Sequence, residues 1–253
     1  MTTGSSAFPA HREPELHGQT VVVIGGSAGI GFETARRARS EGAKLIITGR
    51  NSERLRDAAS ELGALSAAAF DATEAAPLER FFREIPATID HVMVTAGRPH
   101  YGRIVDMDFA QARRALDEHL MLTIQVARHA VNRVRPGGTL IFMSGTGARR
   151  PGIGRGILST VSAALPALVA SLAIELAPVR VNLIAPGFVD TPLSASLLGD
   201  ELDNRRNELR AKLPIRRVVG PADVAALAVH IMVNGAITGA TYDIDGGQQL
   251  VGA

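Results

Sequence analysis

The sequence of 253 residues contains no cysteine and no tryptophan, and aromatic residues make up only 4%. The lack of cysteine excludes disulfides, thiol nucleophiles and thiolate metal sites. None of the seven histidines stands at a recognised ligand spacing from another, so no metal site is expected. No apolar run reaches the ~18 residues that a membrane span requires, so no membrane partner is expected. The net charge is +2 without a long basic run, and nucleic acid is therefore not an expected partner.

Tyrosine and lysine are also scarce, because each occurs only twice: Tyr101 and Tyr242, Lys44 and Lys212. A mechanism that needs either residue at a particular place can therefore be checked by inspection. The other basic residues are all arginine. The arginine pairs at 149–150, 205–206 and 216–217 are expected to be solvated charges on surfaces or loops.

The chain is expected to form a short arm followed by one domain. Residues 1–17 are polar and lack the apolar core of a secretory signal, which indicates a flexible N-terminal arm of a cytoplasmic protein. From residue 18 to residue 253, apolar runs rich in Val, Ile and Leu alternate with helical patterns. Near-continuous apolar strands are typical of a parallel sheet with helices on both faces. The sequence therefore predicts an α/β fold, a Rossmann-type doubly wound parallel sheet in a single domain.

The expected strands are 20–24, 44–48, 65–70, 89–95, 139–143, 179–184 and 240–244, and the expected helices are 29–41, 52–62, 74–84, 109–135, 158–176 and 221–233.

A glycine-rich loop between the first strand and the first helix predicts a dinucleotide site. The loop reads Gly25-Gly26-Ser27-Ala28-Gly29-Ile30-Gly31. Small residues let backbone N–H groups approach a pyrophosphate, and the helix N-terminus adds partial positive charge. The second strand ends at Arg50-Asn51-Ser52, where an acidic residue would bind the ribose of NAD and Arg favours a 2′-phosphate. NADP(H) is therefore preferred over NAD(H).

Five motifs in order resemble those of the short-chain dehydrogenase/reductase family in its single-domain form, over residues 18 to 250. They are the glycine loop, Phe70-Asp71-Ala72, Thr95-Ala96-Gly97, the run from Arg180 to Pro192, and Thr238-Gly239 with Asp245-Gly246-Gly247. The resemblance implies cofactor contacts from Gly25, Ser27, Ala28, Gly29, Ile30, Gly31, Arg50, Asn51, Ser52, Asp71, Ala72, Ala96, Gly97, Pro186, Gly187, Val189 and Thr191.

The four catalytic positions that the family implies depart from its pattern. The family uses Asn, Ser, Tyr and Lys, with Lys four residues after the Tyr that acts as general acid and base. Counted from the flanking motifs, these positions fall on His119, Gly145, Leu158 and Ser162. A one-residue gap would restore Ser144 to the Ser position. No gap restores the Tyr-Lys pair, because neither tyrosine is followed by lysine at that spacing.

Four side chains are candidates for the missing chemistry: Ser144, His119, which stands at the Asn position, Ser159 and Tyr101. An imidazole can exchange a proton near neutral pH, and a serine hydroxyl can orient a substrate oxygen. Residues 190–219 correspond to the family's substrate-covering segment. Its apolar first part predicts an apolar or mixed substrate, and its Arg side chains are expected to be solvated, with binding of an acidic group as the alternative.

Two functions remain open from the sequence. The first is an NADP(H)-dependent oxidoreductase of this family type that acts on a carbonyl or alcohol small molecule through a non-standard proton donor. The alternative is an NADP(H)-binding protein without redox catalysis: a sensor, a partner subunit or a non-redox enzyme. The resemblance also implies a homodimer or homotetramer.

Overall fold

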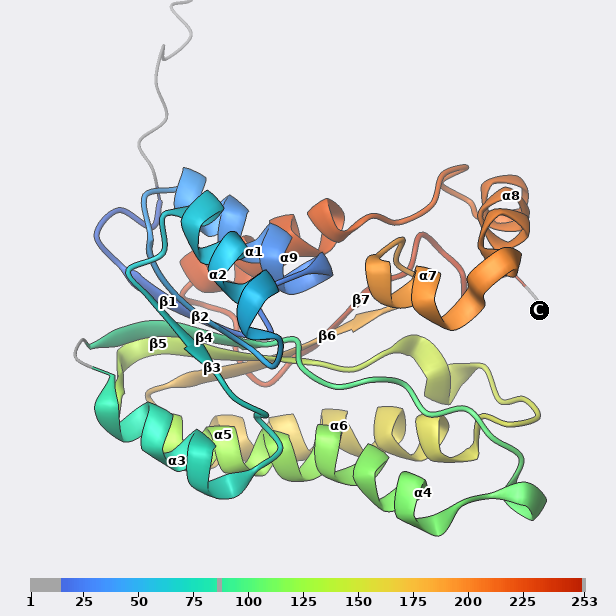
Figure 1. Ribbon diagram of the computed structural model, residues 1–253, viewed down its shortest axis with the longest axis horizontal. Coiled ribbons are helices and arrows are strands. Elements are labelled where there is room, and N and C mark those ends of the chain that lie inside the picture. Colours follow the sequence, from blue (N-terminus) through green and yellow to red (C-terminus); the bar gives the residue numbers. More distant parts are fainter. Residues whose placement is uncertain (1–14, 86–87, 252–253) are drawn as a thin grey trace, which may run out of the picture.

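The computed structural model describes residues 15–85 and 88–251, and within them seven strands form one parallel sheet (Figure 1). The strand order is β3-β2-β1-β4-β5-β6-β7, so the order reverses beside β1, between β1 and β4. This confirms the expected doubly wound Rossmann-type fold. The strands are β1 (Thr20–Ile24), β2 (Lys44–Gly49), β3 (Ser66–Ala69), β4 (Ile89–Val94), β5 (Val134–Met143), β6 (Arg180–Pro186) and β7 (Thr241–Ile244).

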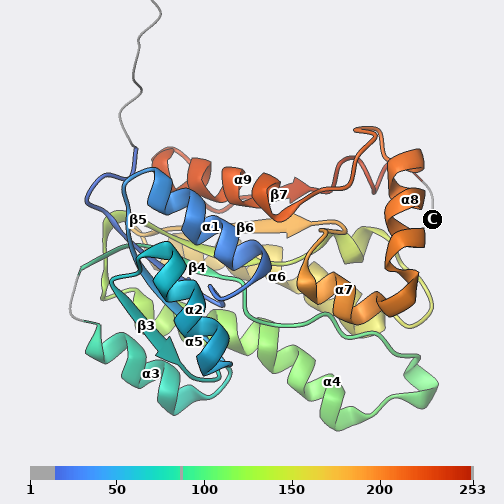
Figure 2. The same cartoon turned by 45° about the horizontal axis from the view of Figure 1, so that its top comes forward.

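Helices cover both faces of the sheet, as the apolar strands require. On one face lie α1 (Gly29–Ser40), α2 (Ser52–Leu62) and α9 (Pro221–Val233); on the other lie α3 (Ala75–Glu84), α4 (Phe109–Leu116), α5 (Leu122–Ala130) and α6 (Gly156–Glu175) (Figures 1 and 2). Each layer encloses its own buried apolar cluster. The short helices α7 (Pro192–Leu198) and α8 (Leu202–Lys212) lie beyond the carboxyl end of β6.

Several expected elements differ from the structure, among them the long helix, the third strand, and the fifth strand, which begins at Val134 and not at 139. The single helix expected over 109–135 is divided into α4, a π-helical turn over Asp117–Met121, and α5, which ends at Ala130. Val134 already belongs to β5 and is paired with Ile89, so the helix has to end before it. The third strand is shorter than expected, and three of its four residues are exposed, because β3 lies at the edge of the sheet.

The expected flexible arm is wrong at its C-terminal end. Residues 1–14 lie outside the described residues. Leu16 is fully buried, and its backbone N–H donates to the Glu41 carbonyl oxygen at 2.9 Å. The folded domain therefore includes Leu16, because this apolar side chain fills a place in the core beside α1 and β2.

Helix α6 begins two residues earlier than expected and continues through Pro166. Among the described helices it alone is long and apolar enough to cross a membrane by length and composition, a test that core helices of soluble proteins also pass. Its Val161, Leu165 and Val169 are buried in the core beneath the sheet. This packing explains the apolar composition of one side of the helix.

Candidate active site

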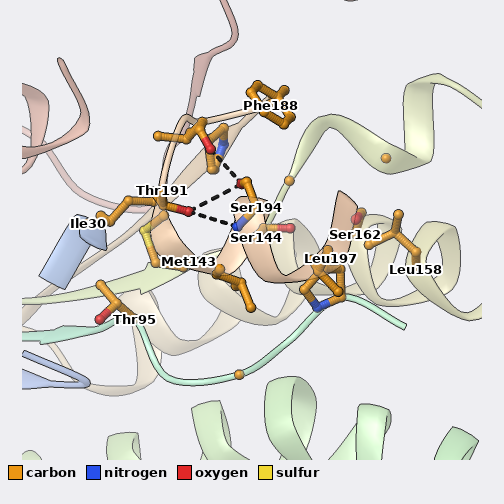
Figure 3. A pocket seen from close by; sticks show the side chains of 18 of the residues that line it. Ile30, Thr95, Met143, Ser144, Leu158, Ser162, Phe188, Thr191, Ser194 and Leu197 are labelled. Carbon is orange, nitrogen blue, oxygen red and sulfur yellow. Dashed lines mark hydrogen bonds between the residues drawn. The ribbon is translucent and has the colours of Figure 1, made fainter. Parts of the chain in front are cut away.

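A cavity of about 730 Å³ lies at the carboxyl ends of the central strands. The segments that follow β4, β5 and β6 line it, together with the start of α1, part of α6 and the residues of α7. Ile30 and Thr191 lie toward one end, and Leu158 and Ser162 lie together on α6 toward the other (Figure 3). In open α/β sheets, ligands bind at this edge, where the strand order reverses.

The glycine loop, residues 25–31, packs tightly at one end of the cavity and forms a backbone surface there, the glycine cradle. A Cβ atom on Gly31 would lie 2.5 Å from Thr95 Oγ1 and closer still to the Gly25 carbonyl oxygen. Only glycine allows this approach of backbone to backbone. The N-cap residue of α1, Ala28, provides no side-chain acceptor, and the first turn of α1 contains no acidic residue. The donors of this turn are therefore open to an anion, as a dinucleotide pyrophosphate requires.

Most of the expected cofactor residues line this cavity. Gly29 and Thr191 come together across it, since a Cβ on Gly29 would lie 3.5 Å from Thr191 Cβ. The Thr191 hydroxyl also accepts from Ser194 N–H at 3.2 Å and so caps α7. The expected residues that line the cavity are Gly25, Ala28, Gly29, Ile30, Gly31, Ala96, Gly97, Pro186, Gly187, Val189 and Thr191.

The expected adenosine residues lie outside the cavity, at the ends of β2 and β3. Arg50 is exposed, and its guanidinium lies 3.9 Å from an Asp71 carboxylate oxygen. Asn51 Oδ1 accepts from Arg54 N–H at 2.8 Å, which makes Asn51 the N-cap of α2. A Cβ on Gly49 would lie 2.9 Å from Ser27 Oγ, so the glycine loop adjoins this group. Ser52 and Ala72 belong to the same region and do not line the cavity.

His119 and Ser144 are two of the catalytic candidates that line the cavity. His119 Nδ1 donates to the Ala115 carbonyl oxygen at 2.9 Å, so Nε2 of the neutral ring is the acceptor. A Cβ on Gly97 would lie 3.4 Å from that Nε2 atom. Ser144 Oγ is buried and has no hydrogen-bond partner among the described residues. His119 stands in the π-helical turn, a feature frequent at functional sites.

The positions assigned to the family's Tyr and Lys also face the cavity. Leu158 and Ser162 stand one turn apart on α6, and a Cβ on Gly147 would lie 3.0 Å from Leu158 Cγ and 3.2 Å from Ser162 Oγ. Gly145, assigned to the Ser position, lines the same cavity beside Ser144. An isobutyl group and a hydroxyl thus occupy the wall at these positions.

The two remaining catalytic candidates, Ser159 and Tyr101, differ in whether they line the cavity. Ser159 does not line the cavity, because its hydroxyl donates to the Gly147 carbonyl oxygen at 3.2 Å. The structure therefore does not bring Ser159 to the cavity wall. Tyr101 does line the cavity, although 55% of its surface is exposed. In residues 15–85 and 88–251, no group of three or more His, Asp or Glu side chains could hold a metal ion.

The expectation of solvated arginines is wrong for Arg150 and Arg205, which line the cavity together with Arg155. The loop after β5 turns Arg150 inward, whereas its neighbour Arg149 points away and pairs with Asp243. The pKa of the Arg150 guanidinium is lowered by burial and then by the nearby charges of Arg155 and Arg205. Sequence adjacency gave no sign that two neighbouring arginines face opposite ways.

Comparisons with known proteins agree with this architecture. Residues 25–249 match the family model of Enoyl-(Acyl carrier protein) reductase. The chain is 28% identical over 256 residues to Short-chain dehydrogenase/reductase ATR9 of Stachybotrys chlorohalonatus, covering 94% of this chain and 99% of that one.

Two solved structures have the same fold. A small-chain dehydrogenase in complex with NADPH has a TM-score of 0.80 and 29% identity, covering 92% of this chain and 99% of the other. The MalC Reductase/Diels-Alderase of Malbranchea aurantiaca has a TM-score of 0.87 and 25% identity, covering 94% and 99%. With its parallel sheet, its glycine cradle and a match over most of its length, the chain belongs to the short-chain dehydrogenase/reductase family of NAD(P)-dependent oxidoreductases.

Proposed function

We propose that the protein is an NADP(H)-dependent oxidoreductase that interconverts a carbonyl and an alcohol on a small molecule, with His119 as the proton donor. The observation that carries the proposal is the single cavity that joins the glycine cradle to the wall formed by His119 and Ser144. The solved NADPH complex of a relative supports the cofactor. Arg50 at the end of β2 supports the phosphorylated form, because a guanidinium suits a ribose 2′-phosphate.

Each residue has a physical task in this proposal. NADP(H), which the glycine loop would hold, would supply the hydride chemistry of the reaction. His119, when doubly protonated, donates the proton on Nε2 to the carbonyl oxygen, while its Nδ1 bond to Ala115 fixes the ring. Ser144 Oγ, buried without a partner, donates a hydrogen bond that orients the same oxygen. Leu158 and Leu197 provide apolar surface in the same cavity.

A cofactor-binding protein without redox catalysis is the second candidate. It is favoured by Leu158 and Ser162, which provide no general acid and no ammonium group at the positions of the family's Tyr and Lys. Loss of a positioned acid costs about 10² to 10⁴ in rate. Only kinetics separates the two candidates, since both need the cradle.

The test is NADPH-dependent reduction of a panel of aldehydes and ketones by the wild-type chain and by His119→Gln. We expect measurable turnover that falls about a hundredfold in the variant while KM changes little, because the acid acts in the transition state. His230→Gln, on the exposed side of α9, is the matched control and should keep wild-type turnover. NADPH binding without any turnover across the panel would favour the second candidate.

The cofactor choice is tested by calorimetric titration with NADPH and NADH. We expect tighter binding of NADPH, and an Arg50→Ala variant should lose most of that preference while NADH binding stays the same. Arg54→Ala, an exposed arginine one turn into α2, is the control. Tighter binding of NADH by the wild-type chain would contradict the role given to Arg50.

We further propose that the chain forms a homodimer or homotetramer. In the single chain, one side of α6 remains uncovered along Ala163, Ala167, Ala170 and Ile174, and Ile174 is 81% exposed. Small residues at this helical spacing allow close approach of a second helix. The same helix on a second copy of the chain would cover this surface.

A further inference from the structure

Three arginines from two separate segments line the substrate end of the cavity. Arg150 and Arg155 belong to the connection between β5 and α6, and Arg205 belongs to α8. The Arg155 guanidinium donates to the Arg150 carbonyl oxygen at 3.2 Å, which holds these two residues together. Arg150 approaches Thr146 Oγ1 at 3.5 Å, and the next residue, Gly147, adjoins Leu158 and Ser162, whereas Arg50 does not line the cavity.

The positive charge of this cluster is compensated only in part, by Asp245 near Arg150 and by Glu208 beside Arg205. No Asp or Glu lines the cavity within the described part of the chain. Arg205 is paired with Glu208 on α8, but neither Arg150 nor Arg155 forms an ion pair with any described residue. By contrast, Arg149, Arg206 and Arg217, which point away from the cavity, are each paired with an aspartate.

Arg150 also retains an unused donor inside the protein. Its Nε atom is buried without a hydrogen-bond partner in the described residues, and one terminal nitrogen reaches Thr146 Oγ1 only at 3.5 Å. A buried donor without an acceptor is costly, and the charge of the half-buried Arg150 is opposed by Asp245 without an ion pair. An anion bound between Arg150 and Arg155 would relieve this cost and would reverse the depression of the Arg150 pKa that burial and the neighbouring arginines cause.

We propose that the Arg150–Arg155–Arg205 cluster binds an anionic group of the substrate, a carboxylate or a phosphate, and so selects acidic carbonyl compounds. The proposal deepens the proposed oxidoreductase function and rests on it for the identification of the bound molecule as substrate. Planar guanidinium groups suit carboxylates and phosphates because they donate two parallel hydrogen bonds. The apolar side chains of Leu193, Leu197 and Leu198 would cover the rest of the molecule.

The experiment compares para-formylbenzoate with its methyl ester, which carries the same aldehyde without the charge. Binding is measured by calorimetry with NADP⁺ present, so that no hydride transfer occurs. The wild-type chain should bind the carboxylate at least about tenfold more tightly than the ester. In Arg150→Gln, the carboxylate affinity should fall about tenfold to a hundredfold, the range of a charge-assisted hydrogen bond, with little change for the ester. A phenyl phosphate titration separates phosphate from carboxylate selectivity.

Controls keep the test decisive. Arg149→Gln removes the adjacent charge outside the cavity and should leave the carboxylate preference intact. Arg155→Gln is a second cavity variant, and the thermal midpoint of each variant confirms that it is folded. Equal affinity for carboxylate and ester in the wild-type chain, or an equal loss in Arg149→Gln, would overturn the proposal.

Two further readouts separate this proposal from the proposed function. An equal weakening of NADP⁺ and carboxylate binding in Arg150→Gln would assign the cluster to the cofactor and would overturn the anion site. Carboxylate preference without NADPH-dependent turnover would instead leave the anion site standing and contradict the oxidoreductase function.

Discussion

His91 on β4 shows how one side chain can link stability to pH. It is 1% exposed, its Nε2 lies 2.7 Å from Gln19 Oε1, and its Nδ1 is buried without a partner in the described chain. Burial is the main cause that lowers its pKa from 6.5 to about 3, while Arg180 and Arg135 lower it further and Asp90 raises it. The folded protein therefore keeps this imidazole neutral in mild acid.

We predict that the free energy of unfolding falls as the pH drops from 6.5 toward about 3, partly because of His91. In this window the His91 imidazole is protonated in the unfolded chain and neutral in the folded chain. The free energy of unfolding therefore falls by up to about 1.4 kcal/mol for each pH unit of acidification. Urea unfolding across this range should show a shallower slope in His91→Gln, whose amide can still donate to Gln19. Exposed His17→Gln is the control, and equal slopes in wild type and His91→Gln would contradict the prediction.

For Arg180, the sequence motif could be recognised, but its hydrogen-bond partners could not be predicted from the sequence. The sequence placed it in the family's sixth-strand motif. In the structure it is 7% exposed and donates to the carbonyl oxygens of Ile231, Met232, Asn234 and Ile237 at 2.8 to 3.1 Å. It thus closes the C-terminal end of α9, where unpaired carbonyls and the helix dipole favour a cation.

At the scale of elements, α6 determines which chemistry reaches the cavity. One side of the helix packs Val161, Leu165 and Val169 under the sheet, and this packing fixes the rotation that turns Leu158 and Ser162 to the cavity. The spacing of the apolar residues predicted the helix. Its earlier start, at Gly156, and the π-helical turn that carries His119 were not predicted, because both depend on contacts with other elements.

We predict that Leu158→Tyr combined with Ser162→Lys raises turnover, because it restores a phenol with an ammonium group four residues later on the same helix. A positioned general acid contributes about 10² to 10⁴ in rate, so kcat should rise by about tenfold or more. Steady-state NADPH oxidation measures the effect. Leu158→Phe adds a ring without the acid and should not increase kcat. An unchanged kcat in the double variant would show that these positions do not stand where the family's pair stands.

At the scale of the whole molecule, the sheet brings distant segments to one edge. The glycine cradle after β1, Thr95 after β4, Ser144 after β5 and Gly187 after β6 meet because all seven strands are parallel and their carboxyl ends coincide. The loop after β6 is held from the C-terminal side, where Gln248 Oε1 accepts from Phe188 N–H at 2.9 Å. The cavity is thus a property of the complete domain.

We predict that Ala167→Arg shifts the proposed homodimer or homotetramer toward smaller species. Ala167 lies in the middle of the uncovered side of α6, where a long charged side chain would prevent close approach of a second helix. Light scattering after size exclusion gives the mass. Ala211→Arg, on an exposed part of α8, should leave the mass unchanged. A wild-type chain that is already monomeric would contradict the proposed assembly.

The sequence by itself determined the parallel α/β fold, the glycine cradle and the absence of a Tyr-Lys pair. These depend on features that can be read from the sequence itself: apolar strands, a glycine-rich turn, and the small numbers of tyrosine and lysine residues. Only the tertiary structure decided that Ser159 donates to the Gly147 carbonyl oxygen and does not line the cavity, that Arg150 and Arg149 face opposite ways, and that Arg205 lines the same cavity as Arg150 and Arg155. The physical reason is that side-chain direction is set by packing between segments far apart in the chain, which no local pattern records.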